Sequence, residues 1–150
     1  ASEVFYRRYE LIHIAKLKQL PGATKMLRSI AAKGFYLAVV SNKRGDYLRA
    51  EIDHLNWSGL FDMIVGANDA EHDKPSPEPI YLALSQAGVE PGPEVWYIGD
   101  TDVDMHFACR TGCVPVLMRE FPPKKGEFDG SQPACHFIDC MTLCKFIDNL

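Results

Sequence analysis

The stretch Val95-Trp96-Tyr97-Ile98-Gly99-Asp100-Thr101-Asp102-Val103-Asp104 decides the fold of this chain. Its first four residues are apolar or aromatic, and three aspartates follow Gly99 at alternate positions. A short, continuous apolar run predicts a strand that is buried on both faces, as in a parallel sheet. Ligands of such sheets bind just beyond the carboxyl ends of the strands, where these three aspartates lie.

Two earlier segments extend this pattern. Phe35 to Val40 is a second apolar run, and it leads directly into Ser41-Asn42. Between the two runs lies Lys74, in the segment Lys74-Pro75-Ser76-Pro77-Glu78-Pro79. The proline after Lys74 favours extended backbone, so a stiff loop presents the ammonium group with little loss of entropy on binding. A hydroxyl, an ammonium group and carboxylates together indicate a phosphate site with a cation beside it.

Each of these segments also has a purely structural interpretation. Ser41-Asn42 is typical of a turn, and Lys74 is typical of a solvated residue before a helix that starts near Pro77. One aspartate after a strand is explained by capping of a helix N-terminus. Three aspartates within five positions repel one another, and this favours a nearby cation or strong hydrogen-bond donors.

The rest of the chain predicts helices that alternate with strands. Gly and Pro residues separate the segments, and apolar residues recur at helical or strand spacing. Such alternation indicates an α/β fold, a doubly wound (Rossmann-like) parallel sheet with flanking helices. The predicted helices cover residues 4–18, 24–33, 46–55, 77–87, 103–110 and 141–149, and the predicted strands cover 35–40, 61–65, 95–98, 114–118 and 136–138.

Composition narrows the class of protein. The 150 residues suffice for one domain, and the net charge of −4 argues against a nucleic-acid-binding protein. No apolar run approaches the roughly 20 residues that span a bilayer. The five cysteines are an odd number and suit reduced thiols, so we expect a cytoplasmic protein. Cys109/Cys113 and Cys140/Cys144 are each one helical turn apart, but no CxxC spacing supports a zinc site.

The three segments, in this order, resemble the haloacid dehalogenase superfamily, and within it the phosphoglycolate phosphatase-like branch. The resemblance covers about residues 20 to 118, and Leu20-Pro21-Gly22-Ala23 is similar to the return from the helical cap of that branch into its core. It implies an enzyme of the phosphoric monoester hydrolase class. Such an enzyme depends on Mg²⁺, acts on a small phosphorylated metabolite and forms a phosphoaspartate intermediate.

The resemblance also implies a role for each matching residue. Ser41 binds the transferring phosphoryl group, and Asn42 lies beside it and contributes through its backbone. Lys74 is the catalytic residue that neutralises the phosphate and the charge of the nucleophile. Asp100 and Asp104 hold the metal. Positioning and charge neutralisation are the main contributions of a protein to phosphoryl transfer.

One part of the family pattern does not match. Members begin with a strand that ends in Asp-x-Asp, whose first aspartate is the nucleophile, but residues 1–40 contain no aspartate. We therefore expect a C-terminal portion, with residues 1–19 as a remnant of the cap or a linker helix and residues 20–150 as an incomplete core. The first strand and most of the cap are then missing, and the nucleophile comes from an upstream segment or a partner chain.

This expectation has a structural consequence. In the family the nucleophile strand lies between the strands that here end at Ser41 and Asp100. Its absence leaves a gap of one strand, near 10 Å at about 4.8 Å per spacing, unless the two strands close up and pair directly. A different function stays open as well, a non-catalytic regulatory protein that binds phosphate and a cation.

Overall fold

The computed structural model describes residues 17–150, so the helix predicted over residues 4–18 falls almost entirely outside the described residues. No helix in this described part is long and apolar enough to cross a bilayer. The elements, in chain order, are α2 (Ala23–Ala32), β1 (Ala38–Arg44), α3 (Gly45–His54), the 3₁₀ turn η1 (Ser58–Leu60), β2 (Met63–Ala67), α4 (Glu78–Leu84), β3 (Trp96–Gly99), α5 (Asp102–Thr111), β4 (Val114–Met118), β5 (Cys135–Phe137) and α6 (Cys140–Asp148).

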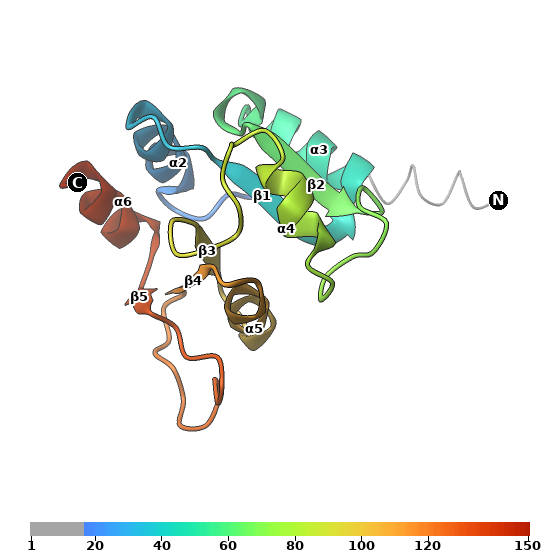
Figure 1. The fold of residues 1–150 in the computed structure, drawn as a ribbon. Coiled ribbons are helices and arrows are strands. Elements are labelled where there is room, and N and C mark those ends of the chain that lie inside the picture. The colour runs from blue at the N-terminus through green and yellow to red at the C-terminus, as the bar shows by residue number, and fades with distance from the viewer. Residues whose placement is uncertain (1–16) are drawn as a thin grey trace.

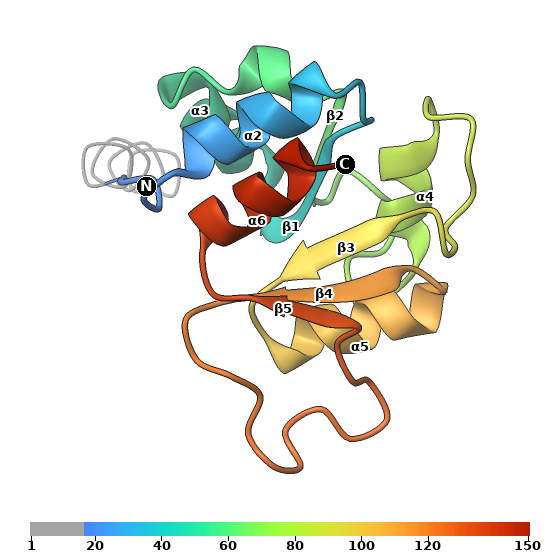
Figure 2. The ribbon, with the colours of Figure 1, turned by 90° about the vertical axis from the view of Figure 1, so that its left-hand side faces the viewer.

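All strand pairs among the described residues are parallel, and helices flank them (Figure 1). The strands form two sheets, β1-β2 and β3-β4-β5. Helices α3 and α4 pack on the first sheet, and α5 packs on β3 and β4 of the second, as Figure 2 shows for the second sheet. The predicted α/β fold with a parallel sheet and flanking helices is therefore confirmed.

The strands β1 and β3, which precede the two candidate segments of the site, are not hydrogen-bonded to each other. The alternative in which they close up and pair directly is therefore wrong. The prediction that both are buried on both faces is also wrong. No residue of β1 is fully buried, and in β3 Trp96 is 39% exposed and Ile98 37% exposed. Side chains alternate along a strand, so Trp96 and Ile98 share one face of β3, which is only partly covered, whereas Tyr97 on the opposite face is 8% exposed.

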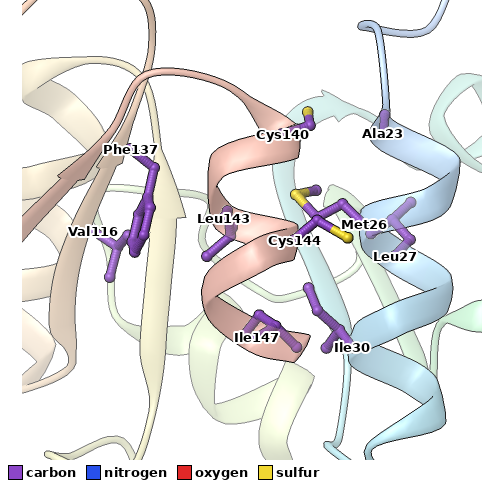
Figure 3. Packing of buried hydrophobic residues seen from close by; sticks show 10 residues of the cluster. All are labelled: Ala23, Met26, Leu27, Ile30, Val116, Phe137, Cys140, Leu143, Cys144 and Ile147. Carbon is purple, nitrogen blue, oxygen red and sulfur yellow. The ribbon is translucent and has the colours of Figure 1, made fainter. Parts of the chain in front are cut away.

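Helices α2 and α6 lie side by side and form the larger apolar core (Figure 3). Met26, Leu27 and Ile30 of α2 are buried against α6, where Ile147 lies beside Ile30, and Leu143 of α6 is buried on the side toward Val116 and Phe137. On its other side, α6 packs against buried residues of β4 and β5, namely Val116 and Phe137. This core fixes α2 and the C-terminal helix on the second sheet.

A second buried cluster connects the two sheets. It contains Ile80 and Leu84 of α4, Tyr97 of β3 and Phe107 of α5, and Val40 of β1 packs against it. We call these five residues the α4–α5 cluster. Because it contains residues from both sheets, it holds β1 and β3 in a common frame although they share no hydrogen bond.

Several predicted boundaries differ from the observed ones. β1 begins at Ala38, and Phe35, predicted to lie in that buried strand, is 48% exposed. Helix α3 begins at Gly45, one residue before the predicted start, so Asp46 lies in its first turn. Helix α4 begins at Glu78, after Pro77, with no side-chain cap, and it ends at Leu84, before the predicted end at residue 87. Turn residues in the sequence therefore predicted that a helix is present better than they predicted where it begins and ends.

The α2–α6 core gives the first testable prediction. Leu143 is fully buried there, and Leu143→Ala removes apolar contacts and leaves a cavity. We expect it to lower the free energy of unfolding by about 2–5 kcal/mol. Urea denaturation measures this change. Leu20→Ala makes the same chemical change at a side chain that is 65% exposed, so a loss as large as that of Leu143→Ala would contradict this account of the core.

Candidate phosphate and cation site

The site begins at the turn between β3 and α5. Thr101 is the N-cap of α5, its hydroxyl oxygen accepts from the backbone N–H of Asp104, and the Asp104 carboxylate accepts in return from the backbone N–H of Thr101. This reciprocal pair is a capping box. Asp104 Oδ2 also accepts from the backbone N–H of Asp100 at 3.1 Å and from the Thr101 hydroxyl at 3.0 Å. The turn is therefore closed around one carboxylate oxygen.

Gly99 makes room for this arrangement. A Cβ atom at this position would overlap the Asp104 side chain. The residue before Asp100 must therefore lack a side chain if the carboxylate is to fold back over the end of β3. The Gly-Asp pair in the sequence thus has a steric cause.

The second oxygen of Asp104 faces Lys74. Its Oδ1 atom lies 3.6 Å from Lys74 Nζ, and the exposed fractions of these two side chains are 17% and 9%. The ammonium group donates a hydrogen bond to the Tyr97 hydroxyl at 3.0 Å and lies 5.7 Å from the ring centroids of Tyr97 and Phe107. Lys74 is thus a largely buried cation beside a carboxylate and two aromatic rings, and it is not the solvated lysine of the structural interpretation.

The segment after β1 reaches the same loop. Asn42 Nδ2 donates to the backbone carbonyl of Lys74 at 3.2 Å. The Ser41 hydroxyl oxygen accepts from the backbone N–H of Lys43 at 3.0 Å, which leaves its own proton available to a ligand. The regular pairing of β1 with β2 is interrupted after Val40, so Ser41 and Asn42 lie where the strand becomes irregular.

These contacts join the three candidate segments into one connected set. The set runs from Asn42 to the Lys74 carbonyl, from the Lys74 ammonium group to Asp104, and from Asp104 to the backbone of Asp100. The structure thus brings together residues that are up to 62 positions apart in the sequence, counted from Asn42 to Asp104. Ser41 lies near this set because it precedes Asn42 in the chain. Its side chain makes no direct contact with the other candidate residues.

The donor chemistry of the site fits a hard divalent cation. Asp100 is exposed, and its carboxylate makes no hydrogen bond or ion pair with the residues that the structure describes. Asp104 contributes a second carboxylate, one oxygen of which is already saturated by three donors. Mg²⁺ prefers one or two carboxylates together with several waters. Asp100 is thus the carboxylate that is available to bind such a cation. Asp104 would support it by holding the backbone of Asp100 in place.

A groove of about 680 Å³ opens beside Asp100. Its walls come from the ends of β3 and β4, the start of α6 and the segment before α2, and they include Leu20, Ile98, Met118 and Ile138. Ile98 and Ile138 are exposed there at 37% and 54%. An apolar groove that ends at a carboxylate is typical of a place where further chain or a ligand binds.

Other candidate residues lie elsewhere. His72, two residues before Lys74, lies on an exposed loop, where its ring Nδ1 and backbone nitrogen contact the Glu78 carboxylate. These hydrogen bonds lower the pKa of Glu78. Cys140 and Cys144 are buried free thiols in the α2–α6 core, and Cys109 and Cys113 are free thiols as well.

Tyr97 also belongs to this site, although the sequence predicts it only as part of an apolar strand. Its hydroxyl contacts the ammonium group of Lys74. A tyrosine in a strand expected to be fully buried was the available signal, because a buried hydroxyl needs a hydrogen-bond partner.

The contact between Gly99 and Asp104 gives the second prediction. Gly99→Ala forces the Asp104 side chain away from the turn, so we expect a loss of about 1–3 kcal/mol in the free energy of unfolding. Urea denaturation measures this loss. In the matched control Gly59→Ala, the added Cβ meets nothing within 4 Å, and we expect a change below about 0.5 kcal/mol. Equal effects of the two variants would show that Gly99 is not needed for the approach of Asp104.

Comparison with known proteins agrees with this geometry. Residues 1–118 match the family described as haloacid dehalogenase-like hydrolase. The chain is similar to a phosphoglycolate phosphatase of Aquifex aeolicus, with 39% identity over 115 residues, which are 77% of this chain and 54% of that protein. It is also 29% identical over 114 residues to a phosphoglycolate phosphatase of Escherichia coli, and this match covers 75% of this chain and 44% of the relative. The chain thus spans about half the length of these relatives.

Solved structures show the same fold. A haloacid dehalogenase superfamily hydrolase from Ehrlichia chaffeensis matches with a TM-score of 0.76 and 33% identity, over 90% of this chain and 60% of that chain. A phosphatase of the same superfamily from Thermococcus onnurineus matches with a TM-score of 0.81 over 95% of this chain and 64% of that one. Its 21% identity supports the fold alone. With the family match over residues 1–118, these findings show that the chain belongs to the haloacid dehalogenase-like hydrolases.

Proposed function

We propose that this chain is the phosphate-binding and metal-binding portion of a Mg²⁺-dependent phosphatase that acts on a small phosphorylated metabolite. The observation that carries the proposal is the connected set formed by Asn42, Lys74, Asp104 and Asp100. A buried ammonium group beside a carboxylate turn with one free carboxylate suits a phosphate dianion and its counter-cation. The similarity to phosphoglycolate phosphatases supports this class of substrate.

Each residue has a role in this proposal. The Ser41 hydroxyl and the backbone N–H groups around Asn42 donate to oxygens of the transferring phosphoryl group. Lys74 neutralises charge that those oxygens and the nucleophile carry. Asp100 holds Mg²⁺, directly or through water, and Asp104 supports that site while it fixes Lys74. When bound, the cation withdraws charge from the phosphoryl oxygens.

The reaction needs a nucleophile that the described residues do not place in this site. We propose an aspartate carboxylate that forms a bond to phosphorus while the bond from phosphorus to the leaving alkoxide breaks. Water then cleaves the acyl phosphate, which releases inorganic phosphate and regenerates the aspartate. Residues 1–40 contain no aspartate, so an upstream segment or a partner chain would supply it.

The arrangement of the sheets supports the proposal that another segment supplies the nucleophilic aspartate. β1 and β3 both end at the site, yet they belong to different sheets, and Trp96 and Ile98 of β3 are partly exposed. A strand placed between them would receive hydrogen bonds from both edges and would bring its carboxyl end to Ser41 and Asp100. In this proposal, residues 20–150 form the core, residues 1–19 belong to a cap or linker, and the protein acts in the cytoplasm.

The proposal predicts a strong effect of Lys74→Ala. We expect the protein, as its gene encodes it, to hydrolyse p-nitrophenyl phosphate with Mg²⁺. Lys74→Ala should lower kcat/KM at least about 100-fold, because it removes the cation that faces the phosphate. Steady-state kinetics measures this effect, and urea denaturation of the same variant measures any loss of folding.

The control for this experiment is Lys125→Ala, which removes an exposed lysine from the loop between β4 and β5. We expect its kcat/KM to stay within about twofold of the unchanged protein. Turnover that Lys74→Ala leaves intact would refute the role of Lys74. Binding of phosphate and Mg²⁺ without any turnover would instead support the non-catalytic alternative.

The metal role of Asp100 is tested separately from turnover. Asp100→Asn removes a charged oxygen ligand, so we expect Mg²⁺ binding, measured by calorimetry, to weaken at least about 10-fold. Asp102→Asn is the matched control, because Asp102 is also exposed and lies only two residues away. Equal weakening by both variants would show a general effect of negative charge and not coordination by Asp100.

A further inference from the structure

Tyr97 carries a polar group that neither the fold nor the proposed reaction has used. Its ring belongs to the α4–α5 cluster, where it makes an edge-on contact with Phe107 at a centroid distance of 5.0 Å. The residue is only 8% exposed. Phenylalanine would fill the same space without burying a hydroxyl, and a buried hydroxyl destabilises the fold unless it is hydrogen-bonded. The hydroxyl therefore requires a specific partner.

That partner is Lys74. The bond from Lys74 Nζ to the Tyr97 hydroxyl, 3.0 Å long, is the one hydrogen bond of this hydroxyl within the described part of the chain. An ammonium group has no acceptor, so the phenol oxygen must accept. Burial and the nearby Asp104 carboxylate raise the pKa of Tyr97. The phenol thus stays protonated at neutral pH and offers Lys74 a neutral oxygen.

The ammonium group of Lys74 is held from two sides. The phenol oxygen lies 3.0 Å away, and Asp104 Oδ1 lies 3.6 Å away. Asp104 itself cannot turn freely, since its other oxygen accepts from Asp100 and Thr101. An ammonium group has three N–H donors. One bonds the phenol oxygen, while Asp104 attracts the group as an ion pair at 3.6 Å, so donor capacity is left for a ligand.

We propose that Tyr97 is a positioning residue, whose phenol oxygen keeps the Lys74 ammonium group aimed at the phosphate. The inference rests on the proposed function of Lys74. Without the phenol oxygen, the aromatic rings still pack, but Asp104 alone attracts the ammonium group. A long lysine stem then has freedom to move toward the carboxylate, and the donor that faces the phosphate loses its fixed direction.

Tyr97→Phe tests this inference, because it removes only the hydroxyl. We expect kcat for p-nitrophenyl phosphate, in the protein as its gene encodes it, to fall about 5- to 30-fold, which corresponds to about 1–2 kcal/mol. KM should change less than threefold, because a less well oriented ammonium group lowers the stabilisation of the transition state more than the binding of the substrate. The Mg²⁺ concentration that gives half-maximal rate should stay unchanged, since Asp100 is untouched.

Tyr36→Phe is a matched control. The Tyr36 hydroxyl donates to the backbone carbonyl of Ala83 in α4 at 2.8 Å, and its side chain packs against the same α4–α5 cluster. This variant also removes one tyrosine hydroxyl and its hydrogen bond, but it leaves Lys74 alone. We expect kcat to stay within twofold, with a loss of stability in urea similar to that of Tyr97→Phe.

The outcomes separate the two proposals. If Lys74→Ala abolishes turnover while Tyr97→Phe keeps full kcat, the positioning role of Tyr97 is refuted and the proposed function stands. Equal losses of kcat in Tyr97→Phe and Tyr36→Phe would also refute it, because they would reflect packing alone. If Lys74→Ala keeps full turnover, the proposed function of Lys74 is refuted, and the role of Tyr97 is refuted with it, because Tyr97 acts only through Lys74.

Discussion

The carboxylate of Asp104 connects the start of α5 to the lysine of a distant loop. One of its oxygens accepts three hydrogen bonds from Asp100 and Thr101, and the other faces the Lys74 ammonium group. A carboxylate that satisfies helix donors is stable at that position without any ligand. The same residue therefore both begins a helix and sets the position of a buried cation.

As a consequence, the neighbouring aspartates of this segment have different roles. Asp104 is committed to protein donors and to Lys74, whereas the Asp100 carboxylate, at the end of β3, has no hydrogen bond or ion pair within residues 17–150. Asp102 is exposed in the first turn of α5. Three aspartates at alternate positions look equivalent in a sequence. Asp100 lies two positions before α5, whereas Asp102 and Asp104 are its first and third residues, and these backbone positions make the three acids different.

Much of this could be predicted from the residues alone. Apolar runs that end in polar residues, with helices between them, suffice for a parallel α/β fold, and the order of the Ser41, Lys74 and Asp100 segments suffices for the family. The partners of side chains could not be predicted. That Asn42 binds the Lys74 carbonyl, or that Tyr97 binds its ammonium group, depends on how distant loops pack. The exposure of Ile98 depends on what covers its face of β3, where it lines the groove with Leu20 and Ile138, and its own sequence does not encode this.

The separation of the strands into two sheets also affects how the molecule loses structure. The hydrogen bonds of β1-β2 and those of β3-β4-β5 form independent ladders, and side chains of the α4–α5 cluster bridge them. Side-chain packing is less directional than a hydrogen-bond ladder. Each sheet with its helices is therefore a candidate for a separate unit of local unfolding. The site at their junction, between β1 and β3, is then held by the α4–α5 cluster together with the polar contacts that link Asn42, Lys74 and Asp104.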